Sequence, residues 1–152
     1  DVVIDTTELN VHQLRSRMLD LFAADAPAGG MQTTVLSFGY KHGLPLDTDL
    51  VIDCRFLPNP HWVEALRPQT GLDEPVRDYV LAQPLTTEFL GQINGLLTTL
   101  LPAYVAEGKS YLTVAFGCTG GRHRSVTIAE AVAGALRDEG FHLRVTHRDL
   151  DR

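Results

Sequence analysis

Apolar and polar residues alternate along this chain with two different periods, and the two periods predict the order of its helices and strands. Residues 86–107 are the clearest helix, because their apolar side chains recur at helical spacing and form one stripe. Further helices are predicted over 8–22 and over the alanine-rich residues 125–139. Short apolar runs predict strands at 2–6, 33–40, 50–56, 111–117 and 142–147.

This alternation predicts one α/β domain over residues 1–152, a mainly parallel sheet of about five strands with helices packed on its faces. A length of 152 residues with 44% hydrophobic content suits a single core. Residues 57–84 break the pattern with prolines and polar residues, so we expect a long irregular loop there, with Trp62 in the core. Ligands of such sheets bind beyond the carboxyl ends of the strands.

Charge and cysteine content narrow the class of protein. A net charge of −6 argues against non-specific nucleic-acid binding, although residues 109–152 carry 7 Lys and Arg against 5 Asp and Glu. Cys54 and Cys118 have no C-x-x-C partner, so we predict no disulfide framework, no metal site and a cytoplasmic location. No apolar run approaches the roughly 18 residues of a membrane span. Because residues 1–6 begin like the middle of a strand, we expect a piece of a longer protein.

The segment from residue 111 to 125 predicts an anion-binding loop. An apolar strand leads into Gly120 and Gly121, where the lack of a Cβ lets backbone N–H groups turn toward a ligand. A helix that starts near Ser125 adds its positive end. Cations in a first helical turn oppose the dipole, so the run Arg122-His123-Arg124 indicates phosphate binding. The alternative for His123 is that it only caps a carboxylate.

The same loop also has the spacing C-x-x-G-x-x-R-S, which resembles the phosphate loop of cysteine-dependent phosphatases. In such an enzyme Cys118 would be the thiolate nucleophile, Arg124 would hold two phosphoryl oxygens and Ser125 would assist the leaving thiolate. Gly117 stands where that family has a histidine, and only Asp53 or Asp73 could be proposed as general acid. The alternative is a buried cysteine at the end of a strand.

Polar side chains before residue 63 form a second candidate group. Asp53 and Arg55 point to one face of their strand and either bind a ligand or pair with each other. Asn59 and His61 lie in a segment stiffened by two prolines, which favours a polar pocket wall. Lys41, at the end of a strand, is either a nucleic-acid contact or part of a solvated turn.

Four long motifs occur in a fixed order along the chain: Ser37-Phe-Gly-Tyr-Lys-His-Gly43, Asp53-Cys-Arg-Phe-Leu-Pro-Asn-Pro-His-Trp62, Leu66-Arg-Pro-Gln-Thr-Gly-Leu72 and Gly117-Cys-Thr-Gly-Gly-Arg-His-Arg-Ser125. Together they resemble the C-terminal domain of the RapZ (YvcJ) family, and the resemblance covers most of the chain. It implies an N-terminal P-loop domain that binds and hydrolyses ATP or GTP. Nothing in this sequence matches G-x-x-x-x-G-K-[ST], so we expect that domain to be missing here and no cofactor in this domain.

In the enteric members, the resembling domain binds glucosamine-6-phosphate and small regulatory RNA, and the protein presents RNA to an endoribonuclease. By motif, the resemblance places Asp53, His61, Cys118, Thr119, Gly120, His123 and Arg124 in a sugar-phosphate pocket. It makes Lys41, Arg122 and Arg124 candidates for RNA contact, and it implies a homo-oligomer. Enteric members end in a lysine-rich tail, whereas this chain ends His147-Arg-Asp-Leu-Asp-Arg152. The acidic residues at this end argue against RNA binding, so metabolite sensing is the main expectation and RNA binding stays the alternative.

The complete set of predicted ligand-binding residues combines the two groups with the resemblance. It consists of Asp53, Arg55, Asn59, His61, Cys118, Thr119, Gly120, Gly121, Arg122, His123, Arg124 and Ser125. The ligand expected for this set is a phosphorylated amino sugar.

Overall fold

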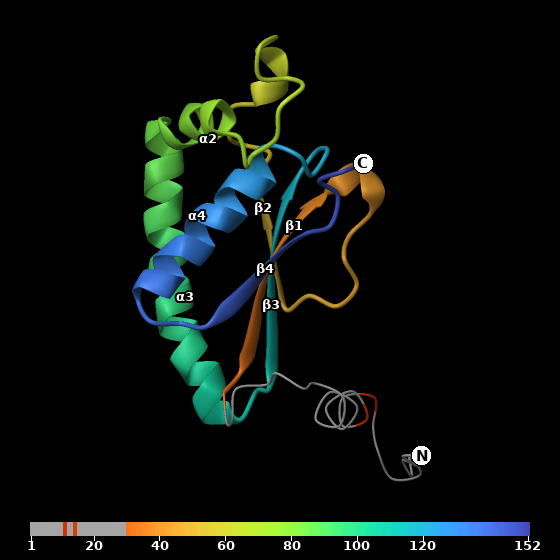
Figure 1. The fold of residues 1–152 in the computed structure, drawn as a ribbon. Coiled ribbons are helices and arrows are strands. Elements are labelled where there is room, and N and C mark those ends of the chain that lie inside the picture. The colour runs from red at the N-terminus through yellow and green to blue at the C-terminus, as the bar shows by residue number, and fades with distance from the viewer. Residues whose placement is uncertain (1–10, 12–13, 15–29) are drawn as a thin grey trace.

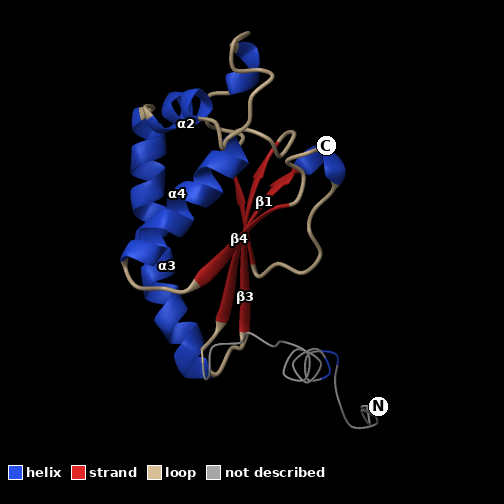
Figure 2. Ribbon diagram, in the orientation of Figure 1, coloured by secondary structure: helices blue, strands red, loops and turns tan. Residues whose placement is uncertain are grey.

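A computed structural model describes residues 11, 14 and 30–152 and arranges them as a sheet with helices against it (Figures 1 and 2). The sheet has four parallel strands, β1 (Gln32–Gly39), β2 (Leu50–Asp53), β3 (Tyr111–Cys118) and β4 (Leu143–His147), in the order β2-β3-β1-β4. The prediction of a parallel α/β domain is confirmed, with four strands instead of about five. The strand predicted at 2–6 and nearly all of the helix predicted at 8–22 lie outside the described residues.

The strand register brings the carboxyl ends of the strands together at one edge of the sheet. Gly39 at the end of β1 pairs with Cys118 at the end of β3, and Asp53 at the end of β2 pairs with Gly117. On the other side of β1, Ser37 pairs with His147, the last residue of β4. The loops that follow the four strands therefore all begin at this one edge of the sheet.

Two of the helices were predicted and one was not. The expected helices at 86–107 and 125–139 are α3 (Pro84–Glu107) and α4 (Arg124–Asp138). Within the segment expected to be irregular, the chain forms α2 (Glu74–Leu81) and a single 3-10 turn at η2 (Pro60–Trp62). A further 3-10 turn, η1 (Tyr40–His42), follows β1. Helix α2 gave a weak signal because it is only 8 residues long and buries only two of them, Val76 and Val80.

The hydrophobic core lies between the sheet and α4, and α3 lies beside α4 and contributes to the same core (Figure 1). Along α4 one apolar face packs on the sheet, through Ile128, Ala129, Val132, Ala133 and Leu136. From the sheet, the core receives Val35, Leu112, Val114 and Phe116. In the part of the chain that the structure describes, these helices cover one face of the sheet.

Helix α3 begins at Pro84, slightly before the predicted start at residue 86, and is rich in apolar residues. By length and composition alone it could cross a membrane, which is weak evidence, because a long core helix passes the same test. One side of α3 belongs to the core, where Leu97 and Leu101 are buried. Its last turn ends at Gly108, which adopts the left-handed conformation (φ 91°) and donates to the carbonyl of Tyr104. These contacts make α3 a core helix with one open face.

Gly71 lets the segment after η2 pack directly on the start of α4. Its N–H donates to the carbonyl of Arg122 (2.7 Å), and its own carbonyl accepts from the Thr127 hydroxyl (3.2 Å). A Cβ at this position would lie 2.3 Å from the His123 carbonyl oxygen. Only glycine permits this approach of two backbones, so residue 71 helps to fix where the loop over the α4 N-terminus lies.

We expect Gly71→Ala to lower the free energy of unfolding by about 1–3 kcal/mol, the usual cost of overpacking. The matched control is Gly95→Ala on α3, where a new Cβ meets nothing within 4 Å. That change should stabilise the protein by about 0.5–1 kcal/mol, because alanine suits a helix better than glycine. Urea unfolding measures both. Equal effects of the two substitutions would contradict the packing role of Gly71.

Candidate functional site

The loop between β3 and α4 is held by close backbone contacts at the carboxyl edge of the sheet. A Cβ on Gly39 would lie 2.5 Å from the carbonyl carbon of Gly120, so the end of β1 packs directly on the loop. Gly121 has a φ of 78°, a conformation that favours glycine. The loop Thr119–His123 is thus a fixed turn that leads its backbone to the N-terminus of α4, as the sequence predicted for an anion-binding loop.

Cys118 lies at the base of this loop and is almost fully buried. Its Sγ is 3.1 Å from the Ser125 hydroxyl and accepts a hydrogen bond from the Gly121 N–H at 3.3 Å. Only 3% of the residue is exposed. The thiol therefore joins the two ends of the loop, and a ligand in the cavity would touch the loop backbone more readily than the sulfur.

Arg124 is buried at the start of α4, and its guanidinium links the loop to the segment after β2. Nη1 donates to the carbonyls of Arg55 (2.7 Å) and Leu57 (2.9 Å), and Nη2 donates to the Thr119 hydroxyl (3.2 Å). Only 4% of the residue is exposed. The sequence reading expected Arg124 to hold phosphoryl oxygens. In the structure most of its described contacts are to backbone carbonyls. Arg124 therefore holds the walls of the site in place and also contributes positive charge to it.

His123 faces the cavity from the N-cap of α4 and is 9% exposed. Burial lowers its pKa below the usual histidine value, and the charges of Arg122 and His61 act in the same direction. Backbone hydrogen bonds with Arg67 and Gln69 oppose them. The Nε2 atom is buried and has no hydrogen-bond partner among the described residues. His123 is thus a neutral imidazole near pH 7 with one ring nitrogen left for a ligand.

The second wall of the site comes from η2 and the residues after it. The Asn59 side chain caps η2 by accepting from the His61 N–H (3.2 Å), and Arg67 Nε donates to the His61 carbonyl (3.0 Å). The ring centroids of His61 and His123 are 6.5 Å apart. Trp62 is 78% exposed, so the prediction that it belongs to the core was wrong. In η2 the residue Pro60 is buried, whereas Trp62 at the end of the turn faces outward.

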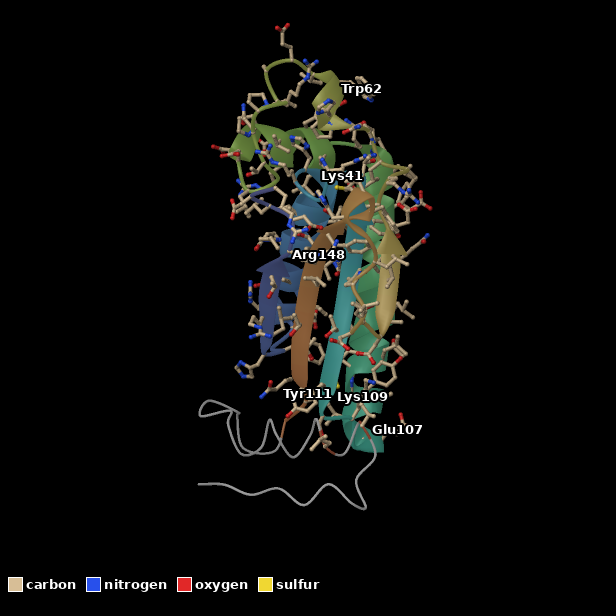
Figure 3. All side chains as sticks on the ribbon, turned by 90° about the vertical axis from the view of Figure 1, so that its right-hand side faces the viewer. Lys41, Trp62, Glu107, Lys109, Tyr111 and Arg148 are labelled. Carbon is tan, nitrogen blue, oxygen red and sulfur yellow. The ribbon has the colours of Figure 1, made fainter. Side chains whose placement is uncertain are left out.

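Lys41 reaches the loop from the end of β1. Its N–H donates to the Thr119 carbonyl (3.2 Å), and its side chain extends over Gly120. Figure 3 places Lys41 and Trp62 toward one end of the molecule, with Tyr111 and Glu107 at the other. Lys41, one of the three residues considered for RNA contact, therefore borders the same cavity as the predicted ligand-binding residues.

These walls enclose a cavity of about 450 Å³, a size that suits a small-molecule ligand. It is lined by Lys41, Asn59, His61, Trp62, Arg67, Cys118, Thr119, Gly120, Arg122, His123, Arg124 and Arg152. The lining contains no acidic side chain. Apart from a distant contact of Arg152, none of its lysine and arginine residues forms an ion pair with another described residue. Such an excess of unpaired positive charge favours an anionic ligand.

Four predicted site residues lie outside the cavity wall: Asp53, Arg55, Gly121 and Ser125. Gly121 and Ser125 support the loop from behind. Asp53 and Arg55 pair with each other at 2.6 Å, which was the structural alternative for them. The Arg55 hydrogen bond lowers the pKa of Asp53, and the charge of Arg124 adds to this effect. The Arg55 guanidinium also lies 4.0 Å from the centre of the Tyr40 ring.

Three residues of the cavity were not assigned to it from the sequence: Trp62, Arg67 and Arg152. The motif Leu66–Leu72 carried a usable signal for Arg67, because Arg67 is its only charged residue and stands directly before Pro68. No local pattern marks Arg152, which reaches the cavity only because β4 ends next to β1.

Comparison with known proteins shows the family to which this arrangement belongs. A nucleotide-binding protein of Parafrankia sp. (strain EAN1pec) is 60% identical over 152 residues, 100% of this chain and 52% of the relative. A nucleotide-binding protein of Thermobifida fusca (strain YX) is 57% identical, over 100% of this chain and 51% of the relative. A nucleotide-binding protein of Rhodococcus opacus (strain B4) is 54% identical, over 100% of this chain and 50% of the relative.

The chain therefore spans about half the length of the curated relatives it matches. The model of the RapZ C-terminal domain matches residues 31–151, a segment that contains all four strands and almost the whole cavity wall. The chain belongs to the family of the RapZ C-terminal domain.

Proposed function

We propose that this domain is a metabolite sensor that binds a phosphorylated amino sugar such as glucosamine-6-phosphate in the cavity over the Thr119–His123 loop. The observation that carries the proposal is the cavity itself, which combines a helix N-terminus with unpaired cations and has no acidic lining residue. Backbone N–H groups and cations at one helix end are the usual partners of a phosphoryl group.

The phosphoryl group is assigned to the loop side of the cavity. There Gly120 offers unobstructed backbone, and Arg122 and His123 have buried nitrogens, Nε and Nε2, without hydrogen-bond partners among the described residues. An unpaired buried donor is costly in free energy unless a ligand satisfies it. A phosphate oxygen at this position would accept from Arg122 Nε and, once His123 takes up a proton, from His123 Nε2, and it would take advantage of the α4 dipole.

The sugar is assigned to the wall formed by η2. Asn59 and His61 present polar groups for hydroxyls, and the exposed ring of Trp62 offers an apolar face for a pyranose. For the amine we assign Asp53, which lies outside the cavity wall and pairs with Arg55, so an ammonium group could reach its carboxylate only after Arg55 moves aside.

This geometry favours binding of the sugar phosphate over hydrolysis of its phosphate ester. A phosphatase would need the Cys118 sulfur to be accessible and the Arg124 guanidinium to face the phosphate. The residue Cys118 is 3% exposed, and Arg124 donates to two backbone carbonyls. Release of inorganic phosphate from the ligand would therefore contradict the proposal.

For the whole protein we propose a nucleotide-binding regulatory protein in which this domain reports the sugar phosphate. The relatives that are about twice as long carry the name nucleotide-binding protein. We place the nucleotide, ATP or GTP, in the half that this chain does not span. Homo-oligomer formation in the cytoplasm, with RNA and a ribonuclease as partners, completes the proposal for the intact protein.

We expect Arg122→Ala to weaken binding of glucosamine-6-phosphate by about 1.5–3 kcal/mol, the range for hydrogen bonds to charged groups. Isothermal titration calorimetry with glucosamine-6-phosphate, glucose-6-phosphate and inorganic phosphate measures this effect. Arg122 is a cleaner choice than Arg124, because loss of the Arg124 side chain would also release the Arg55 and Leu57 carbonyls.

The matched control for Arg122→Ala is Arg137→Ala, which removes the same charge in the last turn of α4, at the helix end away from the loop. It should leave the affinity for all three ligands unchanged. Equal losses in Arg122→Ala and Arg137→Ala would mean that the ligand responds only to net charge and would refute the proposed site.

His61→Ala should reduce discrimination among the sugars more than affinity for inorganic phosphate.

A pH prediction follows from the lowered pKa of His123. The unfolded chain takes up a proton at this residue near pH 6.5, whereas the folded chain does so only at lower pH. Stability from this source is therefore complete above about pH 6.5 and is lost as the pH falls below it. The free energy of unfolding should decrease less in His123→Gln than in the wild type between about pH 7.5 and pH 5.5. Identical pH profiles in urea unfolding would show that His123 is not the titrating group.

A further inference from the structure

Asp149 is a charged residue that the fold buries completely, just after β4. It is 0% exposed, and its Oδ2 accepts hydrogen bonds from the Gly39 N–H (2.8 Å) and from Arg148 Nε (3.0 Å) and Nη2 (2.7 Å). Burial raises its pKa, but the Arg148 and Gly39 hydrogen bonds and the nearby positive charges outweigh burial, so the pKa lies below its usual range. The sequence reading used Asp149 only as one of the acids at the end of the chain that argue against RNA binding, and the structure shows that it is an internal anchor.

Arg148 completes this anchor. Besides Asp149, its Nη2 donates to the carbonyls of Gly39 (3.3 Å) and Gly43 (2.7 Å), and its guanidinium lies 5.5 Å from the centre of the Phe38 ring. The turn that follows β4 is thus fixed to the end of β1. Figure 3 shows Arg148 on the same side of the sheet as Lys41, near the carboxyl ends of the strands.

The anchor formed by Arg148 and Asp149 also contacts the Thr119–His123 loop. A Cβ on Gly121 would lie 2.6 Å from the Gly39 nitrogen and 2.8 Å from the Asp149 Cβ. Gly121 therefore packs against both partners of the hydrogen bond between the Gly39 N–H and Asp149. Through this contact the position of the turn after β4 and the shape of the loop are set together.

Arg152 extends from this turn into the cavity wall, which it shares with Lys41 and Arg122. Its Nη1 is 3.6 Å from Asp149 Oδ1, a separation that gives charge attraction but is too long for a hydrogen bond. Asp149 Oδ1 is buried and has no hydrogen-bond partner among the described residues. The Arg152 side chain is 60% exposed. The carboxylate thus orients Arg152 and leaves its five N–H donors available.

We propose that Arg152 is a ligand-binding residue of this cavity, which contacts the phosphoryl group of the bound ligand, and that Asp149 is the positioning residue that holds Arg152 over the loop. The proposal rests on the proposed function, because it assigns a further contact to the same phosphoryl group. It adds a third wall, formed by the turn after β4, to the walls formed by the loop and by η2.

The charges favour a shift of the Arg152 guanidinium from Asp149 toward the phosphoryl group of the ligand. A phosphate monoester carries a charge of about −1.5 to −2 at pH 7 and has three strong acceptor oxygens, whereas Asp149 offers Arg152 one unbonded oxygen. The guanidinium can form a two-pronged contact with a phosphoryl group while it stays within the field of the carboxylate. Because Asp149 is already neutralised by Arg148, it does not repel the ligand strongly.

Calorimetric titration of the 152-residue chain with glucosamine-6-phosphate and with inorganic phosphate tests the contact. Arg152→Ala should weaken both affinities by about 5- to 30-fold, the size expected for a charged hydrogen bond at a partly exposed position. Arg152→Lys should recover part of the loss, because the charge returns without the planar fork. Arg137→Ala, the equal charge change at the far end of α4, should stay within about twofold of the wild type.

Asp149→Asn tests the positioning role, because it keeps the side-chain shape and removes the charge that orients Arg152. It should weaken phosphate binding in the wild type and have little further effect on affinity in the Arg152→Ala background. Its effect on thermal stability should be the same in both backgrounds. An affinity loss that is equal with and without Arg152 would show that Asp149 acts through the loop alone and would overturn the positioning role.

The series separates this proposal from the proposed function. If the wild type binds, Arg122→Ala loses binding and Arg152→Ala does not, the cavity function stands and the Arg152 contact is overturned. If the wild type binds neither compound at millimolar concentration, both are overturned. Loss in both variants, with Arg137→Ala unaffected, supports both.

Discussion

The buried guanidinium of Arg124 is the interaction on which the site depends. One arginine in the first turn of α4 joins the segment after β2, through the Arg55 and Leu57 carbonyls, to the loop after β3, through Thr119. No described carboxylate pairs with it. Burying a cation without a counter-charge is unfavourable, so this contact maintains a positive potential in the cavity that an anion would relieve. The same side chain that assembles the walls also prepares them for a negative ligand.

Around this arginine, small residues allow backbones to meet where side chains would keep them apart. Gly39 packs on the carbonyl of Gly120, Gly121 on the Gly39 nitrogen, and Gly71 on the carbonyl of His123. Together these contacts bring the end of β1 and the segment after η2 against the loop that leads into α4. The parallel register makes the meeting possible, because it ends the strands at one edge and gives each following loop only a short distance to travel. The contacts that stabilise the fold at this edge therefore also form the site, and the cavity lies where the strand ends converge.

The sequence predicted the parts of this construction that have a local signature. Strand β3, the glycine pair and helix α4 follow from an apolar run, two residues without Cβ and a helical period, and the carboxyl-edge rule placed them at a ligand site. Residues whose role depends on tertiary neighbours were not predictable in this way. Trp62 looks like a core residue until η2 is seen to hold it outward, and Asp149 looks like surface charge until Gly39 and Arg148 are seen around it. Helix α2 was missed because two buried valines do not make a periodic pattern.

The most direct test of the central claim is a titration of the isotopically labelled chain with glucosamine-6-phosphate, followed by NMR of the backbone amides. The account predicts that the largest shifts fall on residues 119–123 and on the Nε–H signal of Arg122, with smaller shifts at Asn59 and His61. Inorganic phosphate should move the loop signals and leave those of η2 in place. Binding with shifts confined to another part of the domain, or no shift at millimolar ligand, would contradict the claim that this loop is a phosphate site.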